Sequence, residues 1–579
     1  MKRCPTCQRV ETDSSLGYCR MDGTSLVVES GSASGSLRTL RLASAPNANE
    51  SGTRILPNAG AADKPVAATT VLDTGRTPGG TWRLSTSQYR RAVVFAVAAL
   101  SVAALAATAF LYSSRGRSST KNSIAVLPFV NASSNPDVEY LSDGITESLI
   151  NSLSRLPNVR VLARSTMFSF KGKDSNPQEV GRQLGVDTVL TGRVVQRGES
   201  LTVQTDLVSV TDGSQIWGER YNRRLTDLLA VQDEIVRDVS QKLRARLSGA
   251  DGQTGTKNHT ADAEAYQLYL KGRYQLNRLT DEGFLRAGEY FRQAIDKDPN
   301  YALAHAGLAD AYNLLSGFNA LSPEEGFPKA RAAAVKALEL DDQLAEAHTV
   351  LATVRFLYEW DWAGAETEFR RAAEVNQNYA NAREMYAYYL AVMGRTDEAL
   401  AEIRLARQLD PLSLSKAIGE GDVFRYGRRH DQALEQYRKA LELDPNSGLA
   451  HWALGNAYTD KGLYEQAIAQ YQKAIPLSGD SPDEPGSLAY AYALSGRRQE
   501  ALQILNDLQR RSARSYISPS IFALIHVGLR DKDQAFDWLD KAYLRRDFML
   551  VLLKAEPVFD SLRSDPRFAE LVRKVGLPQ

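Results

Sequence analysis

Cysteine is almost absent from this chain of 579 residues, because its three cysteines, Cys4, Cys7 and Cys19, all lie at the amino-terminal end. A disulfide framework is therefore excluded for everything that follows. Histidine is also scarce, and the first of the six histidines is His259, so no histidine lies near the cysteines in sequence. The 70 Lys and Arg residues nearly balance the 69 Asp and Glu residues. Such a balance makes a nucleic-acid partner unlikely on electrostatic grounds.

Sequence motifs of catalysis are missing as well. The chain contains no Walker loop, no dinucleotide-binding glycine fingerprint, no G-x-S-x-G elbow and no H-E-x-x-H pair. Two short stretches could suggest catalysis, namely Ser142 and Asp143 in "LSDGIT" and Arg164 with Ser165 in "ARST". Ser or Asp in front of an amphipathic run is typical of a helix N-cap, and this interpretation is favoured over catalysis. We therefore predict a protein that is not an enzyme.

One long hydrophobic run is present, over residues 92–112. It holds 21 residues without a charge, and at 1.5 Å per residue it spans about 31 Å, the thickness of a bilayer core. Tyr89 and Arg90 precede it, and Arg115 follows it, as interfacial anchors do. The alternative is a buried, alanine-rich helix of a soluble domain, which would normally show a polar face. The sequence predicts a single transmembrane helix over residues 89–112.

The orientation of this helix follows from two weak signals. The basic residues on its two sides are almost balanced and slightly favour a cytoplasmic amino terminus. Thiolates persist in a reducing cytosol, whereas a long stretch without cysteine suits an oxidising exterior. We expect a single-pass membrane protein with residues 1–91 in the cytoplasm and the large carboxy-terminal part outside, in the periplasm. Residues 27–88, rich in Ser, Gly, Ala and Pro, are predicted to form a disordered linker.

After a short linker at 113–122, strands and helices alternate. "SIAVLPFV" (123–130), "EYLSDGITESLINSLSRL" (139–156) and "VRVLAR" (159–164) predict a β-α-β unit. A helix is predicted near 177–184, then antiparallel strands, then a long helix at 226–247. This order indicates a sheet covered by helices.

The same segment resembles a known family. "SIAVLPF", "YLSDGITESLINSLS", "VDTVLTGRV" and "IWGERYNR" are similar to the TolB-like amino-terminal domain, over residues 123–248. Bacterial sensor and regulator proteins of that family carry this domain outside a transmembrane helix. The resemblance implies an extracytoplasmic sensing or docking module without catalytic activity. Trp217 and Tyr221 are interpreted as core or rim aromatic residues rather than a ligand platform.

A repeat of 34 residues follows a linker at 249–262. In the clearest copy, 448–481, small residues recur at repeat positions 8, 20 and 27, which are Gly455, Ala467 and Ala474. Five copies between 380 and 549 keep this frame, and earlier echoes such as "AHAGLADAY" bring the count to about eight over 263–549. This period and these small residues are typical of the tetratricopeptide repeat, which is a pair of antiparallel helices. The array should stack into an all-α solenoid.

The concave groove of such a solenoid is, by resemblance to the family, lined by the first helix of each repeat. Repeat positions 2, 5, 9 and 12 should face it, and a protein or peptide ligand is expected there. The peptide-carboxylate clamp of some members needs several Lys, Asn and Arg residues that this array does not offer. Any one of these positions could also be plain solvated surface. The predicted groove residues are Tyr388, Asp422, Arg425, Trp452, Asn456 and Tyr490. Residues 550–579 are predicted to form capping helices over the last repeat.

The cysteines belong to a short knuckle at residues 1–26. "CPTC" is followed by Cys19 and, at the same two-residue interval, by Asp22. The stretch resembles the zinc-ribbon knuckles at the start of many bacterial membrane proteins. Zinc accepts thiolate and carboxylate ligands, so Cys4, Cys7, Cys19 and Asp22 form a candidate structural zinc site. Asp22 either binds the metal or begins a turn with Gly23.

The fold class is therefore multidomain: a zinc-ribbon knuckle, one transmembrane helix, an α/β TolB-like domain and an all-α tetratricopeptide solenoid. The expected function is protein–protein interaction by a membrane-anchored protein, through the repeat groove. The alternative is a signalling or transcription-related regulator whose cytoplasmic knuckle contacts an effector or nucleic acid. Against that alternative, the knuckle has few basic residues and no recognition helix.

The zinc hypothesis predicts that the purified full-length chain holds one zinc ion. Cys7→Ser should abolish zinc binding because it removes a thiolate, and Asp22→Ala should weaken it more modestly. Zinc is measured by elemental analysis after dialysis against a weak chelator. An unchanged zinc content in Cys7→Ser would show that the cysteines do not form the site.

Overall fold

The computed structural model of the chain describes residues 2–3, 10–11, 27–28, 123–133, 135, 138–245, 260–318 and 320–578. It divides into two units, Met1–Val102 and Ala103–Gln579, each described by itself. In the first unit three short strands form an antiparallel sheet in the order β2-β1-β3. They are β1 Lys2–Arg3, β2 Val10–Glu11 and β3 Val27–Val28. β3 lies at the start of the segment predicted as a disordered linker.

Several predictions fall outside the described residues. They concern the candidate zinc ligands Cys4, Cys7, Cys19 and Asp22 and the predicted transmembrane helix at 89–112. Within the described ranges, no helix is both long and apolar enough to cross a membrane. The same ranges contain no cluster of three or more His, Cys, Asp or Glu side chains arranged to hold a metal ion.

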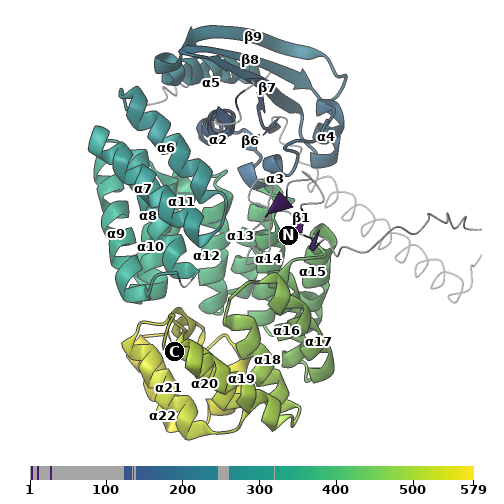
Figure 1. Cartoon of the computed structure of the whole chain (residues 1–579), viewed down its shortest axis with the longest axis vertical. Coiled ribbons are helices and arrows are strands. Elements are labelled where there is room, and N and C mark those ends of the chain that lie inside the picture. The colour runs from purple at the N-terminus through teal and green to yellow at the C-terminus, as the bar shows by residue number, and fades with distance from the viewer. Residues whose placement is uncertain are drawn as a thin grey trace, which may run out of the picture. The chain divides into compact units, whose positions relative to one another are not determined.

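The α/β domain opens the second unit (Figure 1). Its sheet has the order β6-β4-β7-β8-β9, with β5 paired to β7. β4 is parallel to β6 and β7, whereas β7, β8 and β9 are antiparallel. The strands are β4 Ser123–Val126, β5 Val130–Asn131, β6 Arg160–Val161, β7 Thr188–Arg197, β8 Ser200–Ser209 and β9 Gln215–Arg224. The helices are α2 Glu139–Ser154, α3 Arg164–Phe168, α4 Pro177–Leu184, η2 Leu225–Asp227 and α5 Leu228–Ala245.

Burial along the strands explains how this sheet is covered. β4 is buried along its whole length, as a central parallel strand should be. β8 alternates, with Leu201, Val203 and Leu207 fully buried and Gln204 exposed. The buried side chains of β8 share one core with those of α2 and α5. One face of the β7-β8-β9 sheet is therefore packed on helices, and the other carries polar side chains.

Eight antiparallel helix pairs follow within the described residues of the repeat region. The first four pairs are α6 Ala263–Leu276 with α7 Asp281–Lys297, α8 Ala302–Gly317 with α9 Pro323–Leu340, α10 Ala345–Val354 with α11 Trp362–Val375, and α12 Ala380–Val392 with α13 Thr396–Leu409. The π-helical turn η3 Arg355–Glu359 extends α10. The other pairs are α14 Leu414–Tyr426 with α15 His430–Leu443, α16 Gly448–Asp460 with α17 Tyr464–Ala474 (extended by η4 Ile475–Leu477), α18 Asp483–Leu494 with α19 Arg498–Arg511, and α20 Pro519–Gly528 with α21 Lys532–Leu544.

Small residues permit the close approach of the two helices in each repeat. A side chain at Gly455 would put its Cβ 2.6 Å from the ring of Tyr471, and one at Gly421 would lie 2.3 Å from the ring of Tyr437. Ala467 is completely buried. The small residues inferred from the 34-residue period thus lie where the helices touch.

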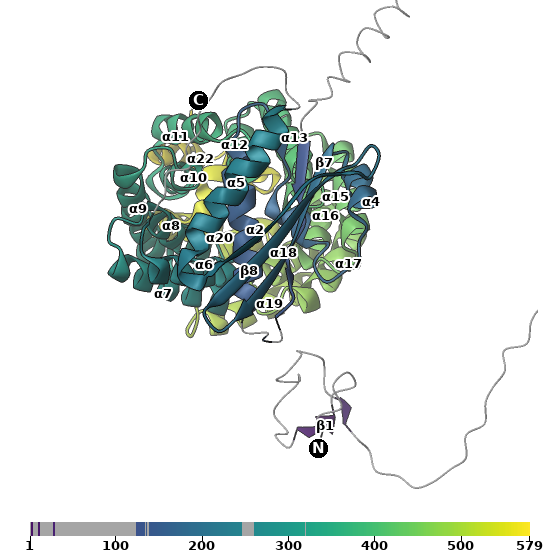
Figure 2. The ribbon, with the colours of Figure 1, turned by 90° about the horizontal axis from the view of Figure 1, so that it is seen from above.

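The carboxy-terminal segment, predicted to cap the last repeat, contacts α20 and α21 of that repeat and also shares a core with earlier repeats. It consists of η5 Phe548–Leu552, η6 Pro557–Leu562 and α22 Pro566–Val575. Its Leu550 and Phe559 are fully buried in the core that contains side chains of α12 and α14. In Figure 2, which looks along the molecule from above, α20 and α22 lie behind the helices of earlier repeats. The segment therefore packs both on the last repeat and on earlier repeats that share its core.

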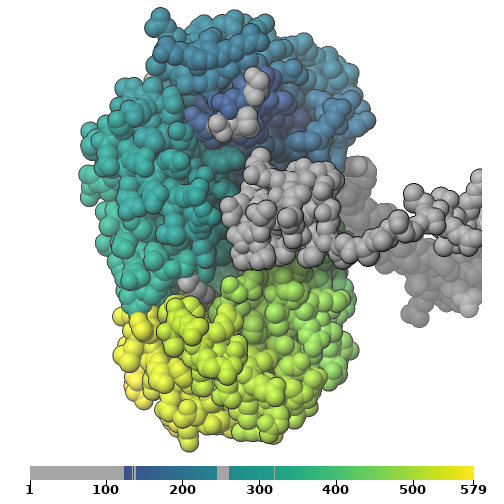
Figure 3. All heavy atoms as spheres, viewed as in Figure 1, coloured from purple at the N-terminus to yellow at the C-terminus, as the bar shows by residue number. Residues whose placement is uncertain are grey.

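The end of the array also contacts its beginning. The rings of Trp360 and Tyr543 lie 5.5 Å apart, and the Arg546 guanidinium lies 4.1 Å from the ring of Trp360. In Figure 3 the carboxy-terminal residues, in yellow, adjoin the early repeats, in teal. The repeats therefore curve far enough for the last helix pair to meet the third.

The α/β domain is bonded to the repeats by buried polar contacts. Asp410 accepts hydrogen bonds from the backbone N–H (3.0 Å) and the hydroxyl (2.7 Å) of Thr166. Arg273 of α6 donates to Glu147 of α2 at 2.7 Å. Burial acts to raise the pKa of the Glu147 carboxyl, but the charges of Arg273 and Arg164 hold it below its ordinary value. These contacts join two domains that the sequence presents as separate.

The helix contact at Ala467 predicts a clear stability difference. Ala467→Leu should destabilise the array by about 1–3 kcal/mol through overpacking. Ala469→Leu is the matched control, because Ala469 is exposed on the same helix, α17, and should change stability by less than about 0.5 kcal/mol. Urea unfolding followed by circular dichroism measures both. Equal midpoints for the two variants would show that the helices do not meet at Ala467.

Candidate functional site

Arg425 lies at the centre of the predicted groove and is almost completely buried. Its Nε donates to Asp460 at 2.6 Å, and its Nη1 donates to Glu556 at 3.0 Å. Beside it, the Tyr437 hydroxyl donates to Asp422 at 2.6 Å. Burial raises the pKa of Asp422 to about 6, although Tyr437 and Arg425 both favour its charged form. A buried cluster of charges therefore occupies this part of the groove.

The cluster corrects the prediction of an open groove at these repeats. Glu556 belongs to the carboxy-terminal segment, and a second pair, Arg428 with Asp560, joins the same segment to the same repeat at 2.8 Å. Tyr388 packs against Phe356 and Tyr426 at ring distances of 5.8 and 5.9 Å. Arg425 thus binds the protein's own carboxy-terminal segment, and Tyr388 and Asp422 contact side chains of the repeats beside it. The sequence analysis did not predict that the carboxy-terminal segment packs here, because the repeat pattern does not indicate where a terminal segment will pack.

The other three predicted groove residues bind neighbouring helices. Trp452 donates its Nε1 hydrogen to the Ser487 hydroxyl of the next repeat at 2.9 Å. Asn456 accepts from the Tyr471 hydroxyl at 2.8 Å. The ring of Tyr490 lies close to Gly528, where a Cβ would approach it to 2.7 Å. All three side chains are partly buried, so they support the stacking of the array.

The stretches that suggested catalysis have structural partners. α2 begins at Glu139, so Ser142 and Asp143 lie inside the helix and do not cap it, and the N-cap prediction is wrong. The Ser142 hydroxyl donates to the Glu139 carbonyl at 3.0 Å, and Asp143 accepts from Lys171 at 2.6 Å. Ser165 donates its hydroxyl hydrogen to Asp410. These partners form no nucleophile–base pair.

The structure confirms the interpretation of the two β9 aromatic residues, Trp217 and Tyr221, as core or rim residues. Tyr221 is buried in the core of the α/β domain, and its hydroxyl donates to Asp238 of α5 at 2.7 Å. Trp217 is partly buried and packs against the same core. Both are structural residues of the packed face of the sheet.

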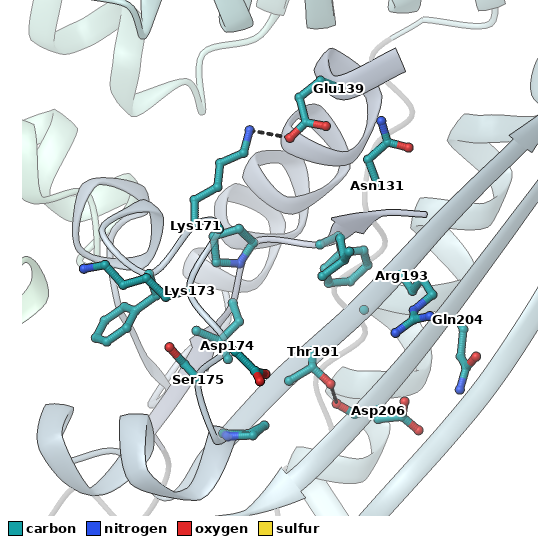
Figure 4. Close-up of a pocket in the computed structure, with 18 residues that line it drawn as sticks. Asn131, Glu139, Lys171, Lys173, Asp174, Ser175, Thr191, Arg193, Gln204 and Asp206 are labelled. Atoms are coloured by element: carbon teal, nitrogen blue, oxygen red, sulfur yellow. Dashed lines mark hydrogen bonds and ion pairs between the residues drawn. The ribbon is translucent and has the colours of Figure 1, made fainter. Parts of the chain in front are cut away.

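A cleft of about 720 Å³ lies on the α/β domain, and its size suits a small-molecule site. It is bounded by the loop 170–175, by residues 127–131 after β4, and by polar side chains of β7 and β8 (Figure 4). Across β7 and β8, Thr191 is opposite Asp206, and Arg193 is opposite Gln204. A cleft at the carboxyl end of a parallel strand is where α/β sheets commonly bind ligands.

Some of the charged side chains of this cleft form ion pairs and others do not. Lys171 bridges Glu139 at 2.7 Å and Asp143 at 2.6 Å. Lys173, Asp174 and Arg193 form no ion pair within the described part of the chain. The sequence reasoning did not identify this cleft, although "FKGKDS" (170–175) concentrates charge around a glycine with positive φ, Gly172.

Comparison with known families gives two matches. A family model of the tetratricopeptide repeat matches residues 418–483. A second model, described as "HilA/YgeH-like transcriptional regulator, second domain", matches residues 119–238. Residues 418–483 therefore match the tetratricopeptide repeat, and the α/β domain is similar to the second domain of those regulators.

Individual relatives cover only part of the chain. A putative adenylate cyclase 3 of Rhizobium meliloti (strain 1021) is 33% identical over 234 residues, which is 40% of each protein. The transcriptional regulator HilA of Salmonella typhimurium is 22% identical over 242 residues, 42% of this chain and 43% of HilA. The matches thus span about two fifths of the length of these curated relatives.

A search of solved structures also finds repeat proteins. The structure of YrrB, titled "a TPR protein with an unusual peptide-binding site", is 25% identical, with a TM-score of 0.24. The match covers 34% of this chain and 96% of YrrB.

The buried cluster predicts unequal effects for two neighbouring arginines. Arg425→Ala should destabilise the protein by about 3–5 kcal/mol, because Asp460 and Glu556 would stay buried without their cation. Arg428→Ala is the control. Its pair with Asp560 is exposed, and its loss should cost no more than about 1 kcal/mol. Chemical unfolding of both variants at pH 7 tests this. Similar losses would show that the carboxy-terminal segment is not held through Arg425.

Proposed function

We propose that the chain is a non-enzymatic, single-span membrane protein that mediates protein–protein interaction through its tetratricopeptide array. The tetratricopeptide array is the observation that carries the proposal, because stacked helix pairs form an extended surface that a partner can bind. The α/β domain, similar to TolB-like domains, serves as a sensing or docking base. Its cleft supports a sensing role, and its hydrogen bonds to Asp410 support mechanical coupling to the repeats.

The partner surface must avoid the part of the groove that the carboxy-terminal segment fills. The repeat around α16 offers exposed apolar side chains at Leu443, Leu449 and Leu477, which are 42%, 46% and 45% exposed. Gly448, the neighbour of Leu449 in sequence, lies close to Leu477, because a Cβ at Gly448 would be 3.2 Å from Leu477. Exposed apolar residues grouped in this way are typical of protein-binding surfaces. Leu449 holds position 2 of its repeat, a position that the sequence assigned to the groove.

We propose that the stretch shared with a putative adenylate cyclase is a regulatory part of both proteins. The shared stretch covers 40% of that relative. Among the described residues of the α/β domain there is no nucleophile–base pair, and Asp143 of α2 is paired with Lys171. The proposed role of the shared stretch is therefore recognition and not catalysis.

A second candidate function is a transmembrane regulator. The match of residues 119–238 to a domain of transcriptional regulators favours it. In that case the cytoplasmic knuckle, with structural zinc on Cys4, Cys7, Cys19 and Asp22, would act on an effector or nucleic acid. The amino terminus is proposed to lie in the cytoplasm and the domains after residue 113 in the periplasm.

Partner capture by the full-length chain, purified in detergent, tests the main proposal. Leu449→Asp should lower the recovered amount of the partner at least tenfold, because a buried carboxylate would replace an apolar contact. The matched control is Leu544→Asp, since Leu544 is 76% exposed on a different helix, α21. Quantitative mass spectrometry after chemical cross-linking measures the recovery.

A partner that is retained equally by wild type and Leu449→Asp would contradict the α16 surface as the binding site. A partner that is lost with Cys7→Ser but kept with Leu449→Asp would favour the regulator, because it would bind the knuckle. Circular dichroism of each variant confirms that the repeats remain folded.

A further inference from the structure

The polar face of the β7-β8-β9 sheet carries four arginines. Arg193 and Arg197 lie on β7, and Arg220 and Arg224 lie on β9. The strand register aligns Arg193 and Arg220 with the same residue of β8, Gln204. It aligns Arg197 and Arg224 with Ser200 in the same way. Since side chains two apart in a strand share a face, all four arginines point to one side. We call these four residues the arginine face.

The arginine face is opposite the helices of its own domain. Tyr221 and Val203 occupy the alternate positions of β9 and β8, and both are buried against α5 and its neighbours. The repeats are bonded through Glu147 of α2 and Thr166 of α3. In Figure 1 the three long strands lie at the end of the α/β domain that is away from the repeats.

All four arginines are exposed, and none forms an ion pair with another described residue. Arg223 provides a contrast within the same strand. It belongs to the opposite face and pairs with Glu234 of α5 at 3.2 Å. The arginine face therefore keeps four uncompensated charges, whereas the packed face neutralises its arginine.

Acidic side chains are nearly missing from the polar face of these strands. The strand register places one there, Asp206, near the cleft, and it accepts a hydrogen bond from Gln215 at 2.6 Å. Four arginines against one aspartate leave this face with an excess of positive charge. Along a strand, arginines four positions apart are separated by about 13 Å, and β7 and β9 lie about 10 Å apart.

The chemistry of the remaining side chains decides which anion fits. They are Thr191, Val195, Ser200, Thr202, Gln204, Gly218 and Asn222. None of them is aromatic, so the face lacks the stacking platforms with which open sheets bind single-stranded nucleic acid. A flat array of phosphate groups needs no such platform and is attracted by clustered arginines.

If the proposed single transmembrane helix holds, the chain keeps the arginine face within reach of the phosphate groups of the membrane lipids. The predicted transmembrane helix ends at 112, and β4 begins at Ser123. A linker of ten residues extends at most about 35 Å. β7 is paired with β4 at Thr188, and Arg193 lies five residues further, about 17 Å along the strand.

We propose that the arginine face docks on the anionic phospholipid headgroups of the membrane in which the chain is anchored. This inference rests on the proposed single span and adds the orientation of the α/β domain at the lipid surface. Docking would hold the repeats away from the membrane, because they are attached to the opposite side of the domain.

Arginine footprinting of the full-length chain tests the docking. The chain is placed in nanodiscs of phosphatidylcholine alone or with one third phosphatidylglycerol, and labelled with phenylglyoxal. Mass spectrometry gives the labelling rate of each arginine. Arg193 and Arg220 should label at least threefold more slowly in the anionic discs. Arg514, exposed and unpaired among the described residues of the repeat region, should label equally in both. Salt at 0.5 M should remove the difference through screening.

A double variant sharpens the test. In R193Q/R220Q the protection of Arg197 and Arg224 should disappear, whereas the control R511Q/R514Q should keep it. Failure of the chain to co-purify with nanodiscs would overturn the single span. Co-purification with equal labelling rates in the two lipids would overturn the docking and leave the span intact. Protection by added DNA, without protection by anionic discs, would also overturn the docking.

Discussion

Arg425 holds together parts of the chain that lie more than a hundred residues apart. It is buried between Asp460, in the next repeat, and Glu556, in the carboxy-terminal segment. A buried guanidinium is tolerated only when carboxylates surround it with good geometry. Together with the buried side chains of Leu550 and Phe559, the pair with Glu556 holds the carboxy-terminal segment against the repeats.

The repeats could be predicted from the sequence because their determinants are local. A period of 34 and small residues such as Gly455 and Ala467 report contacts within one helix pair, and the structure has those contacts. The helix of Pro177–Leu184 could likewise be predicted, since proline at its start and Gly185 at its end mark both boundaries. α2 was less accurately predicted. Its N-cap residue, Val138, has no side chain that can cap a helix, so the sequence analysis placed the N-cap at Ser142 instead.

The groove and the cleft could not be predicted in the same way, because they depend on distant segments. Nothing in the helix around Arg425 indicates that Glu556 will reach it. The cleft requires the loop around Lys173 to lie beside Arg193 of β7, an arrangement that only the folded sheet provides. The arginine face is an intermediate case. Alternation along β7 and β9 is visible in the sequence, but the register that aligns Arg193 with Arg220 is a property of the sheet.

The order of synthesis gives the carboxy-terminal segment a further significance. Residues 548–577 leave the ribosome after all eight helix pairs, so during translation the inner surface around Arg425 has no Glu556 to meet. Until then the apolar side chains that later contact Leu550 and Phe559 are open to water and to chaperones. A chain cut short before residue 556 would keep that exposed surface permanently.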